Sequence, residues 1–173
     1  MPPAQGRPDE STGNPARART GERRRQGRTI LTVRLPEREA RARFAAVPVA
    51  RLATADGRGR PHVVAVTFAV DGDVIYTAVD QKPKSGTVLK RLRNLGENPW
   101  ACMLADHYCA DWDKLWWVRA DGRAAILADR RQMAAPLRLL ADRYPQYRRA
   151  PPPGPVIALA VERWSGWAAA PAS

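Results

Sequence analysis

Residues 49–79, VARLATADGRGRPHVVAVTFAVDGDVIYTAV, are the stretch that decides the fold. Short runs rich in Val, Ile and Thr alternate here with turns that contain Gly and Pro. The sequence predicts three strands in an antiparallel meander, over 49–55, 62–70 and 73–79. The dipeptide Asp71-Gly72, between the second and third strands, is typical of a tight hairpin.

Further strands and helices are predicted on both sides of this stretch. The strands lie over 100–105, 115–127 and 156–167, and the middle one is expected either as one strand or as a hairpin about Asp121-Gly122. Amphipathic helices are predicted over 35–47, 84–99 and 135–147. Ser85 suits the start of the second helix and Gly96 its end, while Pro136 suits the start of the third.

The order of the elements is helix, three strands, helix, two or three strands, helix and strand. This order favours a mainly β fold with helices, of the α+β class, in which an antiparallel barrel has helices packed against it. Hydrophobic residues make up 45% of the 173-residue chain, which is typical of a globular protein. Residues 31–173 are therefore expected to form one folded domain.

Residues 1–30 differ in composition from the rest of the chain. They contain almost no large apolar side chains and many arginines, so we expect a disordered basic tail. An alternative is that the natural chain starts downstream. The arginines at 23–25 suggest a twin-arginine export signal, but the residues that follow are too short and too charged for its apolar region.

The overall composition restricts where the protein works and what it binds. No apolar run approaches the length of a membrane span, and two cysteines, Cys102 and Cys109, make no disulfide framework. We expect a cytoplasmic protein. The formal net charge of +12 favours anionic partners such as phosphates, nucleic acid or acidic lipid headgroups.

Residues 106–117, DHYCADWDKLWW, gather the most reactive side chains. Zinc sites use three or four ligands at fixed spacing, and this segment has one His, one Cys and scattered Asp residues. A Cys–His nucleophile would lack a third group that orients the base. The segment is therefore interpreted as a polar connection between two strands, with tryptophans that pack on a surface or a partner chain.

The tetrapeptide RGRP, Arg58–Pro61, resembles the core of the AT-hook, which binds the DNA minor groove. Because apolar strands are predicted directly on both sides, a hairpin turn is the alternative interpretation. A nucleic-acid or anion-binding protein that uses this segment and the basic tail stays open as a second hypothesis, although nucleic acid is the less favoured partner.

The basic run DQKPKSGTVLKRLRN, residues 80–94, follows a predicted strand and enters a helix. Lys82, Lys84, Lys90 and Arg91 lie close to the helix start. Cations beside free backbone N–H groups suit a phosphate. The alternative is a solvated helix face. The spacing is not that of a P-loop.

Taken together, these segments resemble the pyridoxamine-5′-phosphate-oxidase-like family of flavin and deazaflavin split β-barrels. The landmarks R-L-A-T, G-x-P-H, I-Y-T and L-x-N-P occur in the family's order over residues 36–168. LWWVRADGRAAIL and RYPQY resemble the coenzyme F-420-dependent branch. The resemblance implies an FMN-binding type of split barrel and a homodimer with two cofactor sites at the subunit interface.

The resemblance also implies which residues contact the cofactor. Val63, Val64, Ala65 and Val66 match the strand that borders the isoalloxazine ring. Tyr76 and Thr77 match the strand end near the cofactor phosphate, and the basic phosphate-binding positions match Lys82, Lys84, Lys90 and Arg91. Ala65 stands where many members have proline. No protein side chain is assigned a catalytic role.

The function implied is hydride transfer to or from a small organic substrate. Coenzyme F-420 is more anionic than FMN, so the basic charge favours F-420, with FMN as the alternative. The hydride chemistry belongs to the cofactor, and the protein orients it. The sequence does not name the substrate.

Overall fold

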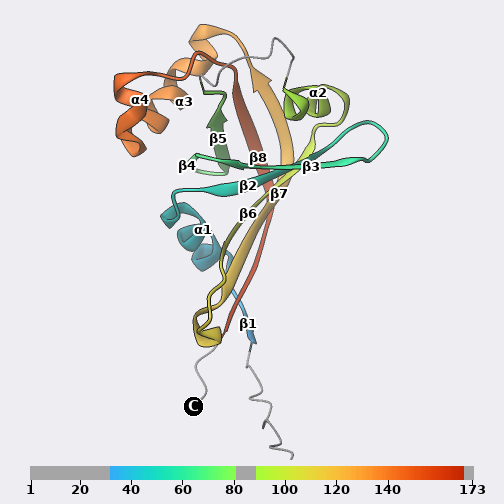
Figure 1. Ribbon diagram of the computed structural model, residues 1–173, viewed down its shortest axis with the longest axis vertical. Helices are drawn as coiled ribbons and strands as arrows, with labels where there is room; N and C mark the ends of the chain where they lie inside the picture. The colour runs from blue at the N-terminus through green and yellow to red at the C-terminus, as the bar shows by residue number, and fades with distance from the viewer. Residues whose placement is uncertain (1–31, 81–88, 170–173) are drawn as a thin grey trace, which may run out of the picture.

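In residues 32–80 and 89–169, which a computed structural model describes, eight strands form one antiparallel sheet (Figure 1). The predicted tail lies outside these residues. The strands are β1 Thr32–Arg34, β2 Ala50–Ala55, β3 Pro61–Val66, β4 Ala69–Asp71, β5 Val74–Ala78, β6 Trp100–His107, β7 Trp116–Leu127 and β8 Val156–Ala169.

The chain itself joins the two edges of this sheet. The strand order is β3-β2-β6-β7-β8-β5-β4, and β1 pairs with β8. β3 and β4 therefore lie at opposite edges, although only Thr67 and Phe68 separate them in sequence. This short connection brings the edges together, and it confirms the predicted antiparallel split barrel with helices.

The helices cover different parts of the barrel. They are α1 Glu37–Ala46, α2 Lys90–Glu97, α3 Arg130–Arg143 and α4 Pro145–Arg149, with a 3-10 turn, η1, over Trp112–Lys114. α3 and α4 lie at one side of the upper end and α2 at the other (Figure 1). α1 packs against β7 and β8.

Phe44 of α1 lies at the centre of the main core. Its ring centroid is 4.9 Å from that of Phe68 and 5.2 Å from that of Trp164, and all three side chains are buried. Leu52, Met103 and Leu159 belong to the same cluster. Burial of these large apolar groups is the main force that holds α1 on the sheet.

The predicted meander is wrong in one respect. The expected strand over 62–70 is interrupted at Thr67 and Phe68, and β3 and β4 do not pair with each other. The hydroxyl group of Tyr144 accepts a hydrogen bond from the backbone N–H of Phe68 and lies 2.8 Å from its carbonyl oxygen. A side chain that is distant in sequence thus satisfies the backbone where the chain changes sheet edge.

Other element boundaries also differ from the expectation. β7 is one strand with a bulge between Asp121 and Gly122, and not a hairpin. α3 begins at Arg130, well before Pro136, because the Asp129 carboxylate accepts hydrogen bonds from two backbone N–H groups of the first turn. The described part of α2 begins at Lys90, after an extended Leu89, and Ser85 lies outside the described residues. β1 was not expected.

None of the helices in residues 32–80 and 89–169 is long and apolar enough to cross a membrane.

Candidate functional site

The strand β3 presents two different faces to its surroundings. Val64 and Val66 point toward the main core, whereas Val63 and Ala65 point outward. Val63 is 59% exposed. This alternation follows from the two-residue period of a strand, and it leaves the backbone beside Ala65 accessible from outside the barrel.

A cavity of about 210 Å³, called the β3–β5 cavity below, opens beside this strand. β3, β5, α2, α4 and their flanking residues line it. Its walls include four of the predicted cofactor residues, namely Ala65, Val66, Thr77 and Arg91. Its other lining residues are Val49, Thr67, Ala78, Asp80 and Tyr147.

The remaining predicted residues lie elsewhere. Val63 lines a separate groove on the outer face of the sheet, and Val64 packs on the core. Tyr76 is partly buried and does not line the β3–β5 cavity. Lys90 lines a third cavity. Lys82 and Lys84 lie outside the described residues.

Arg91 supplies a positive charge to the wall of the β3–β5 cavity. Burial lowers the pKa of its guanidinium, while the nearby carboxylate of Asp80 acts in the opposite direction. An arginine nevertheless stays protonated under ordinary conditions. A partly desolvated cation at a cavity wall is stabilised when an anion binds next to it.

His62, three residues before Ala65 on β3, also responds to the positive charge of Arg91. Its pKa is lowered from 6.5, first by burial and then by the positive charges of Lys90 and Arg91. The start of α2 therefore places a positive potential over this end of β3.

Tyr147 is the site residue that the sequence did not single out. Its side chain is buried and lines the β3–β5 cavity, and its hydroxyl oxygen lies 2.8 Å from the hydroxyl oxygen of Thr67. In the sequence, the segment RYPQY is only a landmark of the family. No local pattern indicates that α4, some eighty residues downstream, returns to the β3–β4 junction.

The cavity lined by Lys90 lies between α2 and the β2–β3 hairpin. Its volume is about 340 Å³, and its charged lining residues are Asp56, Arg58, Arg60, Lys90, Arg93 and Glu97. The two carboxylates are engaged in holding the hairpin tip. Glu97 accepts a hydrogen bond from the backbone N–H of Gly57 at 2.9 Å, and Asp56 accepts from the backbone and side chain of Arg60. RGRP thus begins within a hairpin turn.

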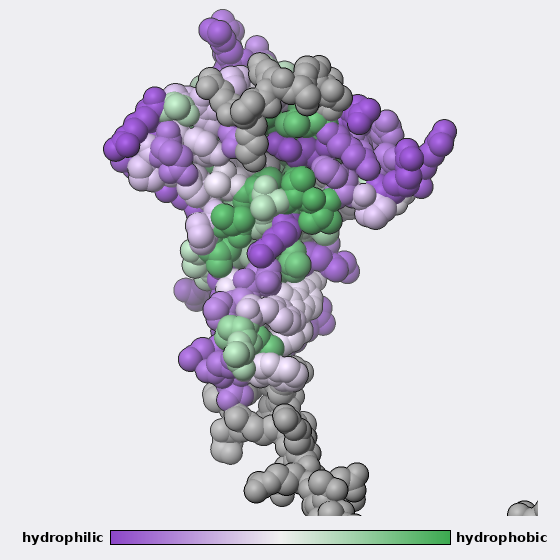
Figure 2. All heavy atoms as spheres, viewed as in Figure 1, coloured by the Kyte–Doolittle hydropathy of each residue, from purple (hydrophilic) through white to green (hydrophobic). Residues whose placement is uncertain are grey.

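The groove lined by Val63 has a volume of about 570 Å³, lies on the outer face of the sheet and is called the sheet groove below. Figure 2 shows a hydrophobic area over the central strands, below the hydrophilic upper end. The sheet groove has an apolar floor that includes Ala53, Val63 and Leu104, and its rim contains Arg51 and Asp106, which form an ion pair of 2.7 Å.

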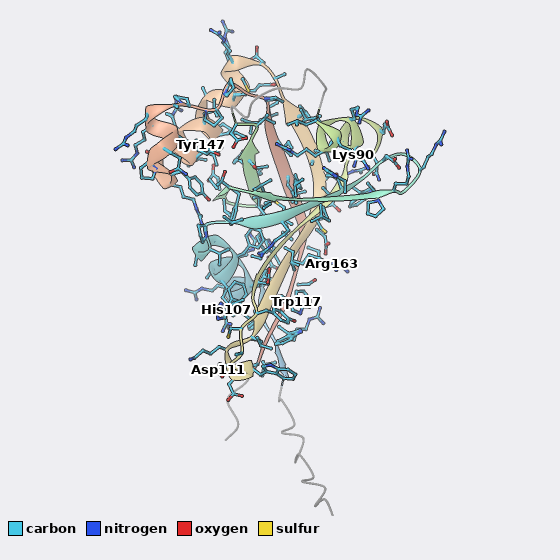
Figure 3. All side chains as sticks on the ribbon, viewed as in Figure 1. Lys90, His107, Asp111, Trp117, Tyr147 and Arg163 are labelled. Carbon is cyan, nitrogen blue, oxygen red and sulfur yellow. The ribbon has the colours of Figure 1, made fainter. Side chains whose placement is uncertain are left out.

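The segment 106–117 belongs to the far end of the molecule. Figure 3 places His107, Asp111 and Trp117 toward the narrow lower end, away from Tyr147 and Lys90. Asp111 pairs with Lys114 at 2.9 Å and accepts a hydrogen bond from the backbone N–H of Asp113. Within residues 32–80 and 89–169, no three His, Cys, Asp or Glu side chains are grouped to hold a metal ion.

The family model described as "Pyridoxamine 5'-phosphate oxidase" matches residues 36–168, which include every strand of the barrel except β1 and the last residue of β8. The chain belongs to this family. The match confirms the resemblance at the level of the family, and the F-420-dependent branch is a finer assignment. No match was found among curated proteins.

Solved structures share the fold of this family member. A FAD-binding protein from Mesorhizobium loti is 21% identical, with a TM-score of 0.62 over 82% of this chain and 100% of that one. The FAD-binding protein from Mycobacterium smegmatis is 17% identical, with a TM-score of 0.54 over 79% and 98%. A heme-binding protein from M. smegmatis is 24% identical, with a TM-score of 0.58 over 78% and 54%. At these identities the likeness concerns the fold alone.

Proposed function

We propose that this protein is a coenzyme F-420-dependent oxidoreductase that transfers a hydride to or from a small organic substrate. The β3–β5 cavity would hold the phosphate end of the cofactor. The observation that carries the proposal is the position of Arg91. Its partly desolvated guanidinium lines one cavity together with Ala65, Val66 and Thr77, three residues from two separate strands.

The lining of the cavity fits a phosphate ester that is attached to a planar ring. Arg91 would pair with the phosphate, and the buried Thr77 hydroxyl would donate a hydrogen bond. The small side chain of Ala65 leaves the backbone of β3 open to the edge of a ring. A bound deazaflavin or flavin would supply the hydride, while the protein would bind, orient and desolvate it.

The preference for F-420 over FMN is supported by the cations on the other side of the α2 start. Arg58, Lys90 and Arg93 line the neighbouring cavity, and none of the three forms a salt bridge within the described residues. FMN carries one phosphate, whereas F-420 carries a phosphodiester and an anionic tail. A second group of cations next to Arg91 therefore favours the more anionic cofactor. FMN remains the alternative.

A second copy of the chain is proposed to cover the sheet groove. Val63 and Tyr108 are exposed large residues in this groove, at 59% and 62%, and exposed apolar surface of this kind marks an interface. The charged residues at its rim are already paired within one chain, Arg51 with Asp106 and Arg119 with Asp121. Two copies can therefore bring the same surface together without opposing like charges.

The dimer is tested by light scattering of the purified protein. The wild type should have the mass of two chains. Leu104→Glu, in the groove floor, should shift the measured mass toward that of a single chain. Ile126→Glu places the same charge on an exposed apolar site that does not line the sheet groove, and it should leave the mass unchanged. A monomeric wild type would contradict the proposed interface.

Parallel titrations with F-420 and FMN test the cofactor assignment. Tight binding of F-420, seen as quenching of its fluorescence, and weaker binding of FMN are the expected results. Arg58→Ala should weaken F-420 more than FMN. If neither cofactor binds at micromolar concentration, the oxidoreductase proposal fails, and salt-dependent binding of DNA would then favour the nucleic-acid hypothesis.

A further inference from the structure

The β3–β5 cavity contains a pair of hydroxyl groups that the family resemblance does not assign. Tyr147 lies on α4, and Thr67 lies at the junction of β3 and β4. Their hydroxyl oxygens are 2.8 Å apart, and both residues line the cavity wall. Tyr147 is buried, so its phenol has little access to solvent.

One hydrogen bond does not use all the donors of this pair. Each hydroxyl has one O–H group that donates and lone pairs that accept. The bond between them uses one proton, whichever residue donates it. Within residues 32–80 and 89–169, neither side chain forms another hydrogen bond, so one O–H group is left to bind a ligand in the cavity.

The charges around the pair indicate what the ligand offers. Arg91 and Thr77 line the same cavity as Tyr147, and their guanidinium and hydroxyl groups can donate hydrogen bonds to a ligand there. Among the described residues of the lining, Asp80 is the one carboxylate. It interacts with Arg91 and has a further polar or ionic interaction. A guanidinium together with several hydroxyl donors is suited to the oxygens of a phosphate.

We propose that Tyr147 and Thr67 together donate a hydrogen bond to a phosphate oxygen of the ligand, whose phosphate also pairs with Arg91. The inference rests on the proposed cofactor site and adds α4 to it. The pair therefore raises the affinity for a phosphate ester above that for the same ring system without its phosphate.

Tyr144 provides a matched comparison, because it is also buried and lies three residues earlier. Its hydroxyl lies 2.8 Å from the carbonyl oxygens of Pro48 and Phe68 and accepts from the N–H of Phe68 at 3.1 Å. The single O–H group of this phenol is thus used within the protein, and Tyr144 does not line the β3–β5 cavity.

The test is calorimetric titration of the full chain with FMN and with riboflavin, which lacks the phosphate. Tyr147→Phe should weaken FMN by about tenfold or more, because the lost bond is to a charged group, and should leave riboflavin unchanged. Tyr144→Phe should lower the thermal midpoint and keep the ratio of the two affinities at the wild-type value. Thr67→Val should act in the same direction as Tyr147→Phe. If only F-420 binds, F-420 and its phosphate-free chromophore replace the two ligands.

The outcomes separate this inference from the proposed function. Equal FMN affinity in Tyr147→Phe and wild type would overturn the inference alone. An equal loss for FMN and riboflavin would also overturn it, since the phenol would then contact the ring or its polyol. A wild type that binds neither FMN nor F-420 would overturn the proposed function, and the inference with it.

Discussion

The side-chain amide of Asn94 donates a hydrogen bond of 3.0 Å to the hydroxyl oxygen of Thr54, and both residues are buried. This bond joins α2 to β2 from inside the protein. Arg91 lies three residues before Asn94, so one buried contact fixes the part of the helix that carries the candidate phosphate ligand. The stability of the barrel and the geometry of the site are therefore coupled at this position.

Replacing Asn94 by Ala is expected to lower the free energy of unfolding by about 1–3 kcal/mol, because the Thr54 hydroxyl loses its buried partner. Urea denaturation measures this loss. Asn98→Ala is the control, since Asn98 accepts one exposed hydrogen bond from the N–H of Trp100. This substitution should lower the free energy of unfolding by less than Asn94→Ala does. If Asn94→Ala and Thr54→Val have additive effects in a double-mutant cycle, the two side chains do not interact as described.

Arg91→Ala is expected to weaken cofactor binding by about 10- to 100-fold, the usual loss for a hydrogen bond to a charged group. Arg38→Ala removes the same charge from an exposed site on α1 and controls for the long-range field. Fluorescence titration with F-420 compares the two variants. Equal affinities would mean that the contribution of Arg91 is only its charge at a distance.

Local patterns in the sequence were sufficient for most of the fold. The alternation of apolar residues and the Gly-containing turns predicted β2, β5, β6 and β8 and the helix α1 at nearly their observed places. The interruption at Thr67 and Phe68 was not predictable in this way, because the hydroxyl of Tyr144, 76 residues away, satisfies the backbone there. A pattern within one segment carries no information about such a distant partner.

The candidate site was predicted only in part for a related reason. Ala65, Val66, Thr77 and Arg91, which the family resemblance assigns to the cofactor, line one cavity. Val63 and Lys90 line other grooves. Side chains alternate between the two faces of β3, and successive residues of α2 point in different directions. Tyr147 was missed because the connection from α3 to α4, and not a local motif, brings it to Thr67.

Gly122 at the bulge of β7 is expected to tolerate no side chain. A Cβ atom there would lie 1.9 Å from the carbonyl oxygen of Ala160, which belongs to the backbone of β8. Gly122→Ala should therefore lower the free energy of unfolding by about 3 kcal/mol or more. Thermal and urea denaturation measure the loss.

Gly96 in α2 provides the opposite comparison. A Cβ atom there meets no heavy atom within 4 Å, and the residue is helical and exposed. Gly96→Ala should raise the free energy of unfolding by about 0.5–1 kcal/mol. A destabilised Gly96→Ala, or a Gly122→Ala as stable as the wild type, would contradict the backbone described for these two elements.

His62 makes the free energy of unfolding depend on pH, and the sign of this dependence follows from the surroundings of the imidazole. Burial and the charges of Lys90 and Arg91 keep the pKa of the native imidazole below 6.5, so the unfolded chain takes up a proton first as the pH falls. The free energy of unfolding should be fully retained above pH 6.5 and should decrease as the pH falls from there toward the native pKa.

NMR titration of the imidazole signals and urea denaturation between about pH 5 and pH 8 test this expectation. Lys90→Ala should raise the pKa of His62, because it removes one of the two positive charges that oppose protonation. His62→Gln should flatten the pH dependence of the free energy of unfolding. An anion bound beside Arg91 should raise the pKa of His62 as well, since it offsets the same field. If the pKa of His62 is the same with and without the bound cofactor, the phosphate does not lie at the start of α2.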